Sequence, residues 1–129
     1  MSETGVGYEL SEKSLRRLDG VKPSLANVVK RAIQISEIDF TVIEGIRTIE
    51  RQRYLLSKGA TRTLKSKHLT GDAVDIAPIV DGKVSWDWKY YPLIEKAMKM
   101  AAHDLGVSIE WGGDWKSFKD GPHFQLATI

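Results

Sequence analysis

The sequence predicts an α+β domain in which a small antiparallel sheet packs against helices. Three observations predict it. Long stretches carry apolar residues at helical spacing, the β-branched runs are short, and the two kinds of segment do not alternate regularly. The chain has 129 residues, about the length of one domain, and its composition marks no linker or internal repeat. A single domain over residues 1–129 is therefore expected.

Four segments have the features of helices. Residues 11–18 and 24–37 each open with a serine that can cap a helix, and the second has apolar side chains at i, i+3 and i+4 spacing. Residues 48–57 are predicted to form a short helix that Gly59 ends. A longer helix is predicted over residues 88–105, because one apolar stripe runs along it through Leu93, Ile94, Ala97, Met98, Ala101 and Leu105.

Four shorter segments are typical of strands. Residues 39–46 alternate in polarity and are rich in β-branched side chains. Short strands also fit residues 73–77, 107–111 and 123–126. These strands and the helices complete the predicted α+β architecture.

The composition excludes several classes of protein. Lys and Arg number 19 against 17 Asp and Glu, and a net charge of +2 is too balanced for a dedicated nucleic-acid-binding protein. Without cysteine there are no disulfides, cysteine nucleophiles or thiolate metal sites, so any metal must be held by His, Asp or Glu. No run approaches the roughly 20 apolar residues of a transmembrane helix, and the polar, acidic N-terminus is unlike a signal peptide. Synthesis in the cytoplasm is expected, without stable membrane association.

The chain has three histidines, and two of them, His68 and His123, stand in unusual sequence surroundings. Between His68 and Asp75, Gly71 permits a positive-φ turn, after which Asp75 can return to the side on which His68 lies. In the strand that follows, Ala73 shares the face of Asp75 and leaves room for an ion, whereas Val74 faces the core. An acid in this otherwise apolar strand needs a partner, and a metal is a suitable one.

A second segment supplies a further ligand and a base. An Asp-Gly turn at Asp120 precedes His123, which is expected to begin the last strand, with Phe124 in the core and Gln125 on the face of His123. Asp120 would lie in the loop, where it can reach over a metal without binding it. The alternative is that Asp120 is only a turn residue, and Asp114 is a local rival that a Gly-Gly-Asp turn explains without chemistry.

Two imidazoles and one carboxylate suit a catalytic Zn²⁺, because they leave one coordination position open. Zn²⁺ in such a site lowers the pKa of bound water to about 7 and polarises a carbonyl oxygen. A nearby carboxylate can take the water's proton and pass it to a leaving amine. The residues therefore predict metal-assisted hydrolysis, with His68, Asp75 and His123 as ligands and Asp120 as the base, although other divalent ions also bind such a set.

The pattern Ser-x-His-x-x-Gly-x-Ala-x-Asp, followed later by Asp-x-x-His, is specific; its positions are Ser66, His68, Gly71, Ala73, Asp75, Asp120 and His123. It resembles the zinc peptidoglycan peptidases, the family of D-Ala-D-Ala carboxypeptidases and L-alanyl-D-glutamate endopeptidases that includes many phage endolysins. The resemblance extends from about Glu44 to Gln125 and includes the segments that contain Arg47 and Trp111. It implies the fold of the D-Ala-D-Ala peptidases and their hedgehog-like relatives, with the zinc site on the small sheet.

The resemblance also implies roles. His68, Asp75 and His123 would bind Zn²⁺, Asp120 would be the general base, and Arg47 would stabilise substrate charge or the oxyanion, unless it forms only a surface ion pair. Carboxypeptidases and dipeptidases of this family often have Glu-x-Trp-His at the second element. The Asp-Gly-Pro-His present here is closer to the endopeptidases, which implies cleavage of the L-Ala–D-Glu bond in the stem peptide. A D-Ala-D-Ala carboxypeptidase or dipeptidase, and a non-catalytic zinc-containing wall-binding module, are the alternatives.

Several further residues have two explanations. Ser66 can hydrogen-bond substrate or brace its loop, and bracing is the preferred interpretation. Trp111 and Trp115, next to the Gly-Gly turn, can line a groove for glycan or stem peptide. Trp86 and Trp88 are expected to be packing or helix-entry residues.

The implied partner is bacterial peptidoglycan, bound by a monomer with no separate cell-wall-binding module, because the motifs take up most of the chain. As in phage lysins, such a chain would wait in the host cytoplasm and reach the wall after membrane permeabilisation. His103, near the C-terminal end of a helix, is expected to be structural. A solvated face, with some attraction to anionic wall polymers, is expected for Arg62, Lys65 and Lys67.

Overall fold

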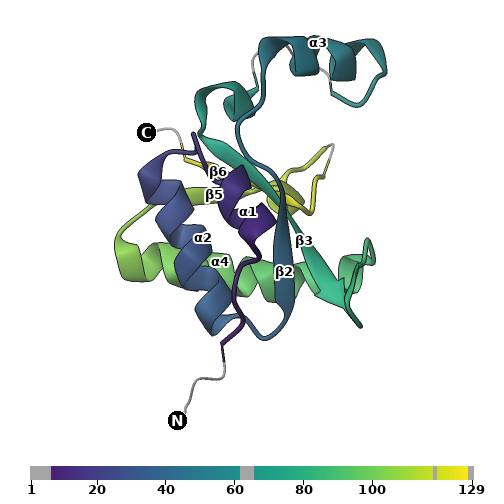
Figure 1. Ribbon diagram of the computed structural model, residues 1–129. Coiled ribbons are helices and arrows are strands. Elements are labelled where there is room, and N and C mark those ends of the chain that lie inside the picture. The colour runs from purple at the N-terminus through teal and green to yellow at the C-terminus, as the bar shows by residue number, and fades with distance from the viewer. Residues whose placement is uncertain (1–6, 62–65, 118, 128–129) are drawn as a thin grey trace.

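The computed structural model describes residues 7–61, 66–117 and 119–127 (Figure 1). Its α-helices are α1 (Glu12–Arg17), α2 (Pro23–Ile35), α3 (Ile49–Ser57) and α4 (Tyr91–Leu105). Its strands are β2 (Asp39–Glu44), β3 (Ala73–Val80), β4 (Lys83–Val84), β5 (Ile109–Trp111) and β6 (His123–Leu126). Three 3-10 turns complete the list: η1 (Lys67–Thr70), η2 (Trp88–Tyr90) and η3 (Gly112–Asp114).

The strands form one antiparallel sheet in the order β2-β3-β6-β5, with the short β4 paired to β3. This confirms the predicted α+β class. The described part of the chain contains no helix that is both long and apolar enough to cross a membrane.

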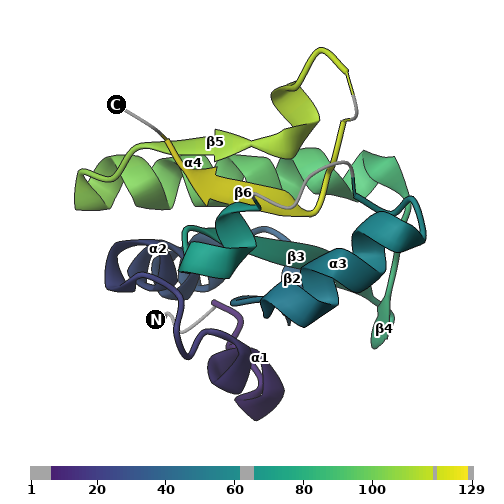
Figure 2. The same cartoon turned by 90° about the horizontal axis from the view of Figure 1, so that it is seen from above.

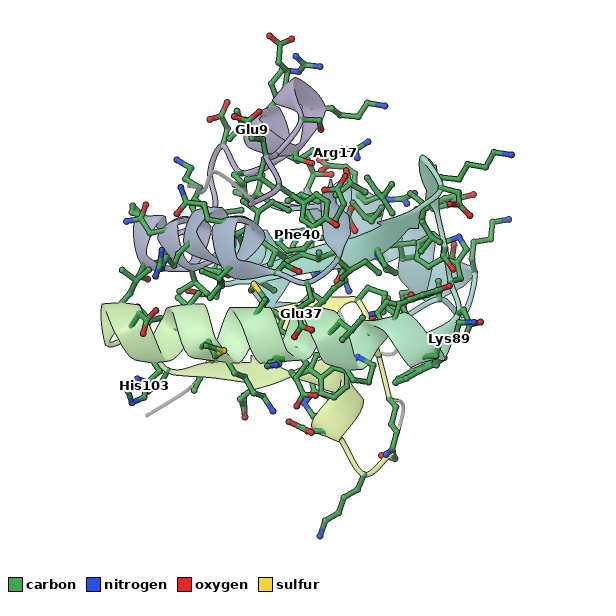
Figure 3. The ribbon with its side chains drawn as sticks, turned by 90° about the horizontal axis from the view of Figure 1, so that it is seen from below. Glu9, Arg17, Glu37, Phe40, Lys89 and His103 are labelled. Atoms are coloured by element: carbon green, nitrogen blue, oxygen red, sulfur yellow. The ribbon has the colours of Figure 1, made fainter. Side chains whose placement is uncertain are left out.

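The core lies between the sheet and the two longer helices. Helix α2 packs against α4, and their buried side chains join those of the central strands in one cluster. Phe40 of β2 is enclosed among these layers, whereas His103 projects outward near the end of α4 (Figure 3). His103 is exposed, as a structural residue at a helix terminus can be.

Most predicted elements are present, with three differences. Ser24 does not cap α2, because Pro23 is already its first residue and Lys22 holds the cap position. The strand β4 and the turn η1 were not predicted, since neither has a periodic apolar pattern. In α4, Leu105 is exposed at the last residue of the helix, while Tyr91 and Ala102 are buried in addition to the predicted stripe.

Helix α1 covers the outer edge of the sheet at β2. The backbone N–H of Val42 donates to Ser14 Oγ at 3.0 Å, and the Val42 carbonyl accepts from Arg17 Nη1 at 2.9 Å. An edge strand whose polar groups are paired in this way is protected from pairing with another chain. The pairing of β2 with β3 is irregular between Val42 and Glu44, and Glu44 thereby stands opposite Asp75.

Candidate metal centre and active site

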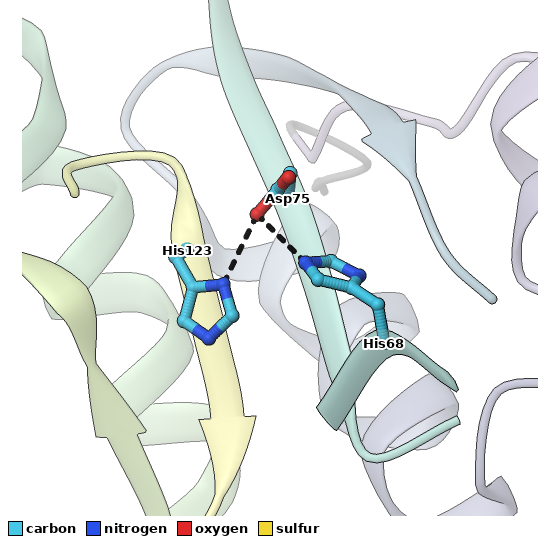
Figure 4. Close-up of side chains that lie close together, drawn as sticks. All are labelled: His68, Asp75 and His123. Carbon is cyan, nitrogen blue, oxygen red and sulfur yellow. Dashed lines mark hydrogen bonds and ion pairs between the residues drawn. The ribbon is translucent and has the colours of Figure 1, made fainter. Parts of the chain in front are cut away.

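His68, Asp75 and His123 come together on the sheet, as Figure 4 shows. One carboxylate oxygen, Asp75 Oδ1, lies 3.3 Å from His68 Nε2 and 3.2 Å from His123 Nδ1. The three donor atoms lie within 4.8 Å of one another, which is a spacing that a single metal ion can bridge. The structure thus assembles all three predicted ligands.

The turn η1 places His68. Ser66 caps this turn, because its Oγ accepts the backbone N–H of His68 at 3.1 Å, so the bracing role expected for Ser66 is confirmed. Gly71 ends the turn at φ +77, and a Cβ there would lie 2.4 Å from the carbonyl oxygen of Gly20. Only glycine fits this position, since both the backbone conformation and the close approach exclude a side chain.

The register of the sheet places the other two ligands. Asp75 of β3 and His123 of β6 are direct cross-strand partners. Their neighbours Val74 and Phe124 are fully buried on the opposite, core-facing side. Alternation along each strand therefore sends the apolar side chains into the core and both ligands into the site.

Hydrogen bonds on the far side of each ring select the nitrogen that faces Asp75. His68 Nδ1 lies 2.8 Å from the carbonyl oxygen of Gly45, which can only accept, so Nδ1 carries the proton and Nε2 is free to bind a metal. His123 Nε2 donates to Gln125 Oε1 at 2.8 Å, and Gln125 Nε2 in turn donates to Glu110 at 2.9 Å. Ring orientation by such outer partners is typical of metal-binding histidines. Two neutral imidazoles and a carboxylate therefore fit a divalent cation such as Zn²⁺.

Without a metal, these contacts shift the pKa values of Asp75 and His123. Burial acts to raise the pKa of Asp75, but hydrogen bonds and charge from His123 and His68 outweigh it and hold this pKa well below the usual range. The pKa of His123 shifts upward. Burial acts to lower this pKa, but the hydrogen bond and the charge of Asp75 raise it by more. Asp75 thus remains ionised, as a metal ligand must be.

Asp120 lies in the loop before β6 and lines the same cavity as the three ligands. Its backbone N–H donates to the carbonyl of Gly112 at 3.1 Å, and its own carbonyl accepts from the backbone of His123 at 3.2 Å. Burial, followed by the charge of Asp75, raises the pKa of the Asp120 carboxyl. A carboxylate that gains a proton more readily than usual is suited to taking one from water.

The cavity beside these residues has a volume of about 1030 Å³. The sheet supplies Asp75 and His123, η1 supplies His68, and α3 supplies Arg51 and Leu55. Helix α3 stands apart from the sheet in Figure 1, and in Figure 2, which is seen from above, it lies in front of β2 and β3. A cavity of this size takes a peptide-sized group rather than a single ion.

Comparison with known proteins identifies the family of this chain. The model of the phage L-alanyl-D-glutamate peptidase family matches residues 6–126. The chain belongs to this family. The L-alanyl-D-glutamate peptidase of Escherichia phage T5 is 35% identical over 119 residues, which cover 89% of this chain and 87% of that protein. The peptidoglycan L-alanyl-D-glutamate endopeptidase CwlK of Bacillus subtilis is 33% identical over 121 residues, covering 78% of this chain and 68% of CwlK.

Solved structures give the same result. The L-Ala D-Glu endopeptidase ChiX of Serratia marcescens superposes with a TM-score of 0.86 at 46% identity, covering 90% of this chain and 87% of ChiX. The vancomycin resistance D,D-dipeptidase VanXYg is 18% identical and superposes with a TM-score of 0.52. The match covers 82% of this chain and 50% of the VanXYg chain. VanXYg thus shares the fold, which places this L-alanyl-D-glutamate peptidase family member in the predicted fold group.

In this family member, Arg47 is not a surface residue. Its side chain is 9% exposed, and it pairs with Glu44 through Nη2, which also lies 3.8 Å from Asp75 Oδ2. Nη1 donates to Gln52 Oε1 at 2.7 Å, and Gln52 is fully buried and also donates to Thr61. The surface ion pair considered from the sequence is therefore wrong, because α3 folds over the arginine. A buried, paired guanidinium beside Asp75 is a fixed positive charge in the cavity wall.

Sequence reasoning did not identify Gln52. Its signal is weak, because a polar residue in the first turns of a short helix is normally exposed. Gln125 was placed on the face of His123, and its hydrogen bond to the ring confirms that placement.

The two tryptophans proposed for substrate contact separate in the structure. Trp115 lines the cavity, and its ring centroid is 5.1 Å from that of His123. Trp111 is buried, stacks on Phe124 and donates from Nε1 to the carbonyl of Gly121 at 2.8 Å. The expectation that Trp111 lines the groove is wrong, because its alternation in β5 directs it into the core. It instead supports the loop that carries Asp120.

The remaining expectations concern the surface. Trp88 stands in the turn that opens α4, whereas Trp86 is 60% exposed rather than packed. Asp114 is exposed and pairs with Lys99 at 2.8 Å, as a plain turn residue would.

Lys67 is half-buried and donates to the carbonyl of Leu126 at 3.0 Å, so it is not part of a purely solvated face. The other two members of the basic run, Arg62 and Lys65, lie outside the described residues.

Proposed function

We propose that this chain is a zinc-dependent peptidoglycan hydrolase that cleaves the stem peptide between L-alanine and D-glutamate. The observation that carries the proposal is the convergence of His68, Asp75 and His123 with Asp120 on one cavity. The phage T5 peptidase and the endopeptidase ChiX, both named for this bond, match 89% and 90% of the chain, and ChiX has the same fold. The local Asp-Gly-Pro-His sequence around His123 supports the endopeptidase branch over the carboxypeptidases.

Zinc would be held by His68 Nε2, Asp75 Oδ1 and His123 Nδ1. When bound there, it polarises the scissile carbonyl and acidifies a water molecule. Asp120 takes the proton from the attacking water and then gives it to the amine that leaves. The raised pKa of Asp120 suits both steps, because the same group must first accept a proton and then release it.

Two further residues would assist this reaction. Arg47, fixed by Glu44 and Gln52, holds a positive charge beside Asp75 and can stabilise negative charge that develops on the carbonyl oxygen. Trp115 narrows the cavity beside His123 and excludes water from one side of it. No covalent intermediate is needed, since water is the nucleophile.

Mass spectrometry of digested peptidoglycan tests the proposal. The zinc-loaded protein is compared with a chelated sample, with Asp120→Asn and with the matched control Asp114→Asn, whose carboxyl is exposed on η3. We expect fragments that begin at D-glutamate, with L-alanine left on the sugar, from the wild type and from Asp114→Asn only.

Other products would contradict the assignment. Peptides that begin at L-alanine would mark an amidase, and loss of terminal D-alanine alone would mark a carboxypeptidase. Absence of cleavage by a protein with zinc bound would favour a wall-binding module. Full activity of Asp120→Asn would remove Asp120 from the role of base.

A further inference from the structure

Positive charge exceeds negative charge on the wall of the cavity. Among the described residues, the wall has four cationic side chains, Arg47, Arg51, Lys67 and Lys119, and three carboxylates, Glu44, Asp75 and Asp120. A divalent ion at the three ligands would add two further positive charges. The cavity as a whole is therefore suited to an anionic ligand.

Most of these charged side chains already have a partner within the protein. Asp75 faces two imidazoles, and Glu44 pairs with Arg47. Lys67 donates to a backbone carbonyl, that of Leu126. Asp120 is reserved for proton transfer in the proposed reaction.

Two cations are less engaged. Arg51 is 52% exposed on α3; its Nε lies 3.8 Å from Glu44, which already pairs with Arg47. Lys119 is exposed, and within the described residues its side chain forms no hydrogen bond or ion pair. Both side chains line the cavity, Arg51 next to the Glu44–Arg47 pair and Lys119 directly before Asp120 in the chain. They are therefore available to a ligand that lies beside the reacting groups.

The proposed substrate has an anion at this place. D-glutamate in a stem peptide continues the chain through its γ-carboxyl group, so its α-carboxylate stays free. That carboxylate is attached to the same carbon as the nitrogen of the scissile bond, and it must lie close to Asp120 when the amine leaves.

Resting on the proposed function, we infer that Arg51 and Lys119 bind the free α-carboxylate of D-glutamate. They would thereby make the enzyme select stem peptides with D-glutamate over those with D-isoglutamine, in which this carboxylate is an amide. The amide has nearly the same shape but no charge. The preference is therefore electrostatic and comes from charge-assisted hydrogen bonds.

The test uses two soluble stem peptides that differ only in this group, the free acid and the amide, and measures kcat/KM for each. The double variant Arg51→Gln/Lys119→Gln is compared with the wild type. The control is Arg53→Gln/Lys116→Gln, which removes exposed charges from the same helix and loop but not from the cavity wall. We expect the wild type and the control to prefer the free acid by about tenfold, the effect of one charged hydrogen bond. In the Arg51→Gln/Lys119→Gln variant, called the cavity variant, kcat/KM for the free-acid peptide should fall to that for the amide peptide. The kcat/KM for the amide peptide should not change.

Each outcome separates this inference from the proposed function. Equal cleavage of both peptides by the wild type would overturn the selectivity while leaving the L-Ala–D-Glu assignment in place. A preference that persists in the cavity variant would overturn the roles of Arg51 and Lys119. Cleavage of neither peptide by the zinc-loaded wild type would instead contradict the proposed function and this inference with it.

Discussion

Gly112 holds the loop that carries Asp120, and replacing it with alanine should displace the proposed base. A Cβ at position 112 would lie 2.3 Å from the carbonyl oxygen of Asp120, 3.0 Å from Asp120 Cβ and 3.1 Å from His123 Cβ. The carbonyl of Gly112 also accepts the backbone N–H of Asp120. The loop therefore rests directly on the glycine, with no space between them.

The size of the displacement follows from these distances. Ordinary contact begins near 3.4 Å, so relief of the 2.3 Å contact requires the Asp120 backbone to move by about 1 Å. A misplacement of about 1 Å in a reacting group can lower the rate roughly 100-fold. Gly112→Ala should thus lower kcat/KM about 100-fold. Zinc should still bind, because the 3.1 Å contact with His123 Cβ needs a shift of only a few tenths of an ångström and the other two proposed ligands, His68 and Asp75, come from other elements.

Steady-state kinetics on a soluble stem peptide, with zinc content and melting temperature measured in parallel, checks this prediction. Gly106→Ala is the control: this glycine has φ +68, where an alanine is strained, but it follows the end of α4 and a Cβ there meets nothing within 4 Å. The control should lose stability and keep kcat/KM. A folded, zinc-bound Gly112→Ala protein with wild-type kcat/KM would refute the reasoning.

Two further predictions concern the metal. Gln125→Leu removes the acceptor that orients His123, so zinc affinity, measured by competition with a chelator, should fall roughly 10- to 100-fold. The pH dependence of the metal-free protein follows from His123, whose pKa is raised above its usual 6.5 by Asp75 against the opposing effect of burial. The protonated ring stabilises the fold fully below that usual value, and this stabilisation is lost as the pH rises through the raised pKa. Denaturant unfolding of the metal-free protein should therefore show a stability that declines as the pH rises above the usual 6.5 of a histidine. Zinc loading should oppose this decline, because the ligands must be deprotonated.

Each of these has its own control. Gln34 is an exposed glutamine on α2, and the control Gln34→Leu should bind zinc as tightly as the wild type does. A zinc affinity of Gln125→Leu equal to that of the wild type would show that the His123 ring needs no outer partner. Asp75→Asn removes the charge that raises the His123 pKa, so its metal-free form should lose much less stability over the same pH range. A metal-free wild type that became more stable with rising pH would contradict the assigned direction.

The local elements of the fold could be predicted because their causes are local. The side chain of Ser11 accepts a hydrogen bond from the backbone N–H of Ser14 and thereby caps α1. Thr48 caps α3 in the same way. The apolar stripe of α4 and the alternation in β2 and β6 depend on neighbours a few positions away. Ser24 is the exception, because a proline beside it had already determined where α2 begins.

The residues that cluster as candidate metal ligands could also be predicted, whereas their hydrogen bonds could not. The motif around His68 and the one around His123 name these residues, but each ring nitrogen is selected by a partner that no motif specifies. Gly45 lies 23 positions from His68 in the chain, and the Gln125 amide depends on a neighbouring strand for its own orientation. These contacts exist only once the strands are in register.

By itself, the sequence determined the α+β class, the candidate ligands His68, Asp75 and His123, the loop position of Asp120 and the family resemblance. Only the tertiary structure decided that Arg47 is buried against Gln52, that Trp111 faces the core, and that Arg51 and Lys119 share a cavity. The physical reason is distance along the chain. Helix periodicity, caps and motifs depend on residues a few positions apart, whereas burial and cavity lining depend on how α3, the sheet and the loop before β6 pack together.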